Sequence, residues 1–95
     1  MLRKPTRKLD SEHAQEIALL ALSFMAEDRE RLVRFLDLTG MSPIELQEQA
    51  CSPNLLGAVL DHLLGDESLL LVFTASAGLS PEIIGPAREM MRRPT

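Results

Sequence analysis

The chain has 95 residues, the size of one domain, and its 45% hydrophobic and 25% charged content is ordinary for a globular protein. Its formal charge is −4, and its single cysteine excludes an internal disulfide. Residues 36–87 contain seven acidic residues and no Lys or Arg, which argues against a phosphate-binding surface there. With three Phe and no Trp or Tyr, aliphatic side chains must fill the core, which favours helices over a sheet.

The same features favour a cytoplasmic protein. A lone cysteine suits a reducing compartment. Residues 3–8 are basic and residues 17–26 are apolar, as in an export signal, but Asp10, Glu12 and Glu16 lie between them. The apolar run is also too short to cross a bilayer. We therefore expect neither export nor membrane insertion.

We expect residues 1–10 to form a flexible basic tail and residues 11–93 to form one all-helical domain. A first helix is predicted to begin after Asp10 or Ser11, which can cap its free amides, and to end near Ala26 or Glu27. Its predicted buried residues recur at helical spacing: Ile17, Leu20, Ala21, Phe24 and Met25.

Start and stop signals delimit the next two helices. Asp28 is a predicted cap for the second helix, which should end where Gly40 can adopt a left-handed conformation. The third begins at Ser42-Pro43, where Ser42 and Glu45 have the spacing of a capping box, and should end near Ala50 or Cys51.

The most apolar stretch, residues 55–77, is predicted to form two further helices. One runs from Ser52-Pro53 to Gly65, and the other from Asp66 to Gly78. Residues 69–73 are apolar on every side, so they could form a buried strand, but the flanking cap and glycine favour a helix. An all-round apolar helix belongs in the middle of a domain, so we expect the first, fourth and fifth helices at the centre.

Ser80-Pro81 begins a sixth segment, in which Pro86 lacks the amide that a continuing helix requires. We expect a kink at Gly85-Pro86, or one turn followed by a separate helix. The predicted fold class is therefore all-α, a compact bundle of five to six short helices.

A shift of 38 residues partly superimposes the chain on itself. Asp28, Phe35, Gly40 and Pro43 then coincide with Asp66, Phe73, Gly78 and Pro81. Two explanations remain open. The chain contains two copies of a three-helix unit that share one core, or common start and stop signals recur by chance.

No residue pattern indicates catalysis, a metal or a cofactor. His13, Cys51 and His62 lack the spacing of zinc ligands. The acidic pairs at residues 27–28 and 66–67 are explained by capping and the helix dipole. No glycine-rich phosphate loop is present. We therefore expect a protein that is not an enzyme, without metal, cofactor or small-molecule substrate.

Two groups of arginines are candidate contact surfaces. Arg29, Arg31 and Arg34 form a possible docking surface for an acidic partner or for another copy. Residues 34–46 resemble a helix-turn-helix, but the second helix offers no basic residue. Nucleic acid is therefore not the expected partner, and any such contact would be made by the basic ends of the chain, specifically Arg88, Arg92 and Arg93.

Many spaced residues also resemble one protein family. In the first half they are Met25-Ala26-Glu27-Asp28, Arg31-Leu32, Arg34-Phe35-Leu36, Thr39-Gly40 and Pro43. In the second half they are Val59-Leu60-Asp61, Leu63-Leu64, Asp66-Glu67, Leu69-Leu70, Phe73 and Pro81. Together they cover about residues 11–92 and resemble a family of small, uncharacterised, all-helical bacterial proteins, a domain of unknown function. The resemblance implies a cytoplasmic bacterial protein and carries no activity, ligand or site residue.

The predicted function follows from the strong core, the segregated charge and the lack of a catalytic pattern. We expect a small non-enzymatic protein–protein interaction module, whose partner is another protein or a second copy of the chain. The alternative is a small regulator that makes weak helix-turn-helix-like contact with nucleic acid through its basic ends.

Overall fold

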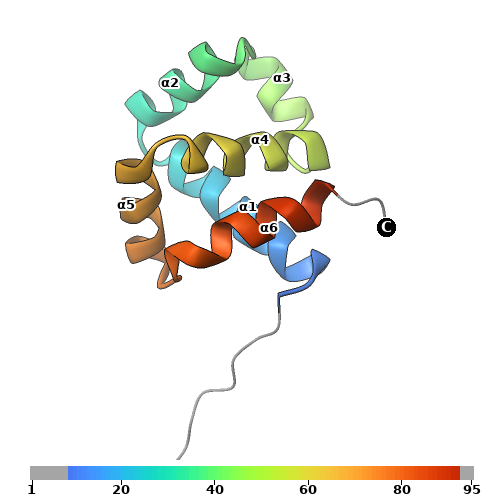
Figure 1. Ribbon diagram of the computed structural model, residues 1–95. Helices are drawn as coiled ribbons and strands as arrows, with labels where there is room; N and C mark the ends of the chain where they lie inside the picture. The colour runs from blue at the N-terminus through green and yellow to red at the C-terminus, as the bar shows by residue number, and fades with distance from the viewer. Residues whose placement is uncertain (1–8, 93–95) are drawn as a thin grey trace, which may run out of the picture.

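The computed structural model describes residues 9–92, which form six α-helices and one short 3₁₀ helix (Figure 1). The predicted tail therefore lies outside the described residues, except for Leu9 and Asp10. No strand occurs in this part of the chain, so the predicted all-α bundle is confirmed. In chain order the elements are α1 (Ser11–Ala26), α2 (Arg29–Thr39), α3 (Pro43–Glu48), α4 (Pro53–Leu64), α5 (Glu67–Ala77), η1 (Pro81–Ile83) and α6 (Ile84–Arg92).

Side-chain caps begin the first five helices where the sequence predicts them. The caps are Asp10, Asp28, Ser42, Ser52 and Asp66, and each accepts a hydrogen bond from a backbone N–H in the first turn. The predicted capping box of α3 is complete, because the Glu45 side chain also accepts a bond from the Ser42 N–H. Replacing such a cap by alanine typically costs about 1 kcal/mol of stability.

The centre of the fold is formed by α1, α4 and α6, which pack against one another. In Figure 1, α6 lies on one side of α4, whereas α2 and α3 lie on the other. Burial of apolar side chains supplies the main stabilisation of such a core. The buried apolar residues are Ala14, Ile17, Ala18, Ala21, Phe24, Met25, Phe35, Leu55, Leu56, Val59, Leu60, Leu63, Phe73, Ile84 and Ala87.

The prediction that α5 lies at the centre is wrong. Only Phe73 and Thr74 of α5 are buried, whereas Leu71 and Val72 are 48% and 50% exposed. The central position belongs to α6, which closes against α1 and α4 through Ile84 and Ala87. Because α6 covers α1 and α4, only one side of α5 meets the core.

The sixth segment forms one turn followed by a separate helix, the second of the two predicted alternatives, and the break lies before Gly85-Pro86 rather than at it. The 3₁₀ turn ends at Ile83 and α6 starts at Ile84, which places Pro86 at the third position of the helix. An amide there has no partner within the helix, so proline is tolerated.

Over the described residues, no single helix has the length and apolar content to cross a bilayer. Only α5 and the η1–α6 segment, taken together, reach that length and apolar content, and the two are bent by 109° relative to each other.

The two halves of the proposed repeat share their connections but not their third helices. Gly40 and Gly78 both end a helix with positive φ, 73° and 70°. The aligned Phe35 and Phe73 are both buried. However, α3 is six residues long and buries no residue, whereas α6 belongs to the core. A duplication would therefore have required the third helix to change its role.

Candidate functional site

An apolar hollow of about 160 Å³ lies between α1 and α5. Phe24 and Phe73 lie side by side in it, with ring centroids 5.3 Å apart and planes inclined by 56°. Both rings are almost fully buried, whereas Leu20 at the edge of the hollow is 51% exposed. The complete lining is Leu20, Ser23, Phe24, Glu27, Phe73, Ser76 and Ala77, and we call this surface the α1–α5 groove.

The groove continues along the outer side of α1. A second, wide-open hollow of about 330 Å³ is lined by Glu16, Leu19, Leu20 and Ser23, so the two share Leu20 and Ser23. On the other side, half-exposed Val72 lies one helical turn before Ser76. Apolar side chains thus extend the groove on both of its helices.

Sequence reasoning missed this surface because it assigned Leu20 to the core. A helix buries one face, and α1 already fills that face with Ile17, Ala21 and Met25. Leu19 and Leu20 lie outside this buried face and are 37% and 51% exposed. The sequence did contain an indication of this surface, because the first helix has more large apolar residues than one buried face can hold.

A polar cleft of about 240 Å³ lies where α2, α4 and α5 meet. It brings together the caps of α2 and α5, Asp28 and Asp66, with Arg34 and His62. Burial lowers the pKa of His62 from its ordinary value, the charge of Arg34 lowers it further, and Asp66 opposes the shift. The His62 and Phe35 rings form a T-shaped pair with their centroids 5.3 Å apart. The full lining is Asp28, Glu30, Arg31, Arg34, His62, Asp66 and Leu69.

The predicted docking arginines do not act as one group. The Arg31 guanidinium stacks 4.0 Å from the centroid of the Phe24 ring, donates to the Phe24 carbonyl and lies 3.9 Å from the Asp28 carboxylate. Arg34 lines the polar cleft beside it, and Arg29 does not. Arg31 therefore joins α2 to α1, while Arg29 and Arg34 have exposed side chains.

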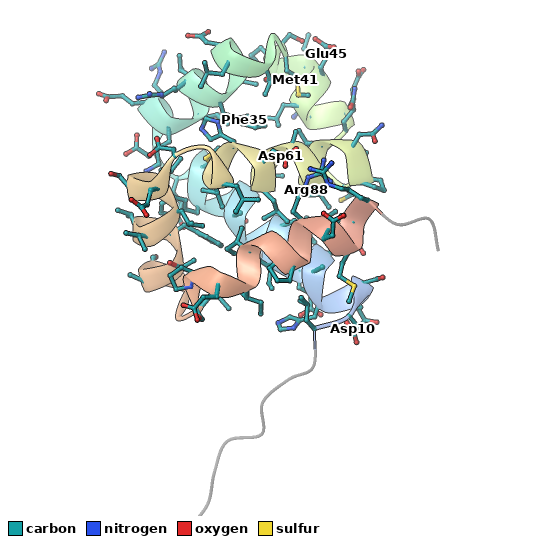
Figure 2. All side chains as sticks on the ribbon, in the orientation of Figure 1. Asp10, Phe35, Met41, Glu45, Asp61 and Arg88 are labelled. Atoms are coloured by element: carbon teal, nitrogen blue, oxygen red, sulfur yellow. The ribbon has the colours of Figure 1, made fainter. Side chains whose placement is uncertain are left out.

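Two of the three predicted nucleic-acid residues, Arg88 and Arg92, contact the same acidic residue. Arg88 donates two hydrogen bonds to Asp61, at 2.8 Å and 3.0 Å (Figure 2). Arg92 lies 3.6 Å from the same carboxylate. The hydrogen bond from Arg88 lowers the pKa of Asp61. Gly57 makes room for this contact. Arg88 therefore joins α6 to α4, and Arg93 lies outside the described residues.

The other residues considered as catalytic or metal-binding candidates are Asp28, Asp66, Cys51 and His13. The Asp28 and Asp66 carboxylates accept backbone hydrogen bonds, as expected of caps. Cys51 is exposed, and Nδ1 of His13 is buried without a hydrogen-bond partner among residues 9–92. Within this range, no group of three or more His, Cys, Asp or Glu is arranged to hold a metal ion.

Comparison with known proteins gives one family assignment. Neither the curated proteins nor the solved structures contain a significant match to this chain. A family model described as "Protein of unknown function (DUF3572)" matches residues 11–94, which include every helix of the structure. The chain therefore belongs to this family, as the spaced residues of the two halves had indicated.

Proposed function

We propose that this protein is a non-enzymatic protein–protein interaction module of the bacterial cytoplasm, which binds a partner in the α1–α5 groove. One observation carries the proposal: Leu20 is half exposed beside a hollow whose floor is formed by Phe24 and Phe73. Contiguous apolar surface next to a concave site is typical of binding surfaces.

The energetic argument supports the same surface. Covering the exposed half of Leu20 would contribute about 2 kcal/mol to binding, at about 25 cal/mol per Å² of apolar area. Leu19 and Val72 add further exposed apolar area on either side. The rings of Phe24 and Phe73 are already packed, so the floor of the groove needs no rearrangement.

Other surfaces of the described residues support the proposal less well. Docking at Arg29, Arg31 and Arg34 is less well supported, because the Arg31 guanidinium already contacts Phe24 and Asp28. Nucleic-acid binding is weakened because Asp61 balances charge on Arg88 and Arg92. In the polar cleft, the Asp28 and Asp66 carboxylates are explained by their role as helix caps.

The test is site-specific photo-crosslinking in cells. A photoreactive amino acid replaces Leu20 in one variant and Gln47, an exposed residue of α3, in a matched control. We expect a discrete protein adduct from position 20 and none of the same mass from position 47. If position 20 gives no adduct, or if both positions give the same one, the proposed docking surface is wrong.

A further inference from the structure

Among the described residues, the charged side chains that line the α1–α5 groove and its extension are acidic. Neither α1 nor α5 contains Lys or Arg, and the charged residues among the described lining of the two hollows are Glu16 on α1 and Glu27, which directly follows α1. The nearest cation whose position is described is Arg31, against the Phe24 ring. Its charge is already met by Asp28 and by the Phe24 carbonyl, so it does not offset the acidic character of the groove.

This charge distribution restricts the occupant. A second copy that binds through the same groove would place acidic residues opposite acidic residues, which disfavours that contact. An anionic membrane surface is disfavoured for the same reason. A basic segment with apolar side chains gains from both the hollow and the surrounding charge.

We infer that the groove binds a partner helix that has an apolar stripe flanked by Lys or Arg. The hollow of about 160 Å³ takes an apolar side chain of that stripe between Leu20 and Ala77. The flanking cations then lie near Glu27, which makes no ion pair within the described residues. This inference rests on the proposed function and specifies the chemistry of the partner.

Two synthetic helices test the charge requirement. Both have about 18 residues, long enough to form a helix, and share one stripe of Leu. One carries Lys on both flanks and the other carries Glu. Binding to the full chain is measured by fluorescence anisotropy at low and high salt. We expect the Lys-flanked helix to bind, more weakly as salt rises, and the Glu-flanked helix not to bind.

Variants of the protein locate the binding site. Glu27→Lys should weaken binding of the Lys-flanked helix about fivefold. Glu48→Lys is the matched control, because Glu48 also lies at the C-terminal end of a helix but far from the groove lining, and it should leave binding unchanged. Leu20→Asp should weaken binding at least about tenfold through loss of apolar contact. Circular dichroism confirms that each variant is folded.

Three outcomes would overturn the inference. The two helices bind equally, neither helix binds, or the protein instead associates with itself through Leu20. Failure of the inference and failure of the proposed function are separable. Absence of any adduct at position 20 removes both. An adduct whose contacting segment, mapped by mass spectrometry, is acidic removes only the basic partner and leaves the docking surface in place.

Discussion

The contact between Arg88 and Asp61 depends on the glycine one turn before the acid. A Cβ atom at position 57 would lie 2.7 Å from Nη1 and 2.9 Å from Cζ of Arg88. The guanidinium group therefore lies directly over the Gly57 backbone while it binds Asp61 with two hydrogen bonds. At this position glycine serves a close approach of two helices, at the usual cost of lower helix propensity.

Gly57→Ala should displace the Arg88 side chain and so raise the pKa of Asp61 toward its ordinary value of 3.8. Stability should change by less than about 1 kcal/mol, because gained helix propensity offsets the lost contact. NMR titration of the Asp61 carboxyl measures the shift. Gly85→Ala is the control, because a Cβ there meets nothing within 4 Å and should leave this pKa unchanged. A normal Arg88–Asp61 contact in Gly57→Ala would contradict the argument.

His62 makes stability depend on pH. Burial holds its pKa below 6.5 in the folded protein, with Arg34 lowering it further and Asp66 opposing. As pH falls, His62 of the unfolded chain is therefore protonated before His62 of the folded chain. The free energy of unfolding is unaffected by this group above pH 6.5 and decreases as the pH falls from 6.5 toward the folded pKa. His62→Phe keeps a ring against Phe35 but cannot be protonated. Urea unfolding from about pH 7.5 to about pH 5 should show a smaller loss of stability in this variant, and an unchanged slope would exclude His62 as the cause.

Among the elements, α2 and α3 contribute few fully buried side chains, although Leu36, Met41 and Leu46 pack partly buried against the core. Together with their connection they form the α2–α3 arm, residues 29–48, in which Phe35 is the only buried residue. Its ring packs against His62 of α4. Leu38 and Ile44, both about two-thirds exposed, add nothing to the core. Elements with few buried apolar contacts open at lower free energy than the rest of a protein.

Amide hydrogens of the α2–α3 arm should therefore exchange faster than those of α4, measured by mass spectrometry at neutral pH. The comparison within one molecule controls for solution conditions, and α4 is the reference because Leu55, Val59 and Leu63 are buried along its length. Equal protection of α2 and α4 would mean that the arm opens only when the whole domain unfolds.

For the whole molecule, local chemistry was more informative than hydrophobicity. Asp28, Ser42 and Asp66 predicted helix starts, because capping depends on neighbouring backbone groups alone. The position of α5 was not predictable, because composition does not reveal that α6 covers α1 and α4 first. Likewise, a pairing such as Arg88 with Asp61, 27 residues apart, leaves no local pattern.

The arrangement of the helices also determines what can be attached to the protein. The start of α1 and the end of α6 lie toward the right and lower side of Figure 1, whereas α5 lies at the left. A label attached to the first turn of α1 or to the last turn of α6 would therefore lie away from α5 and leave that helix open to solution.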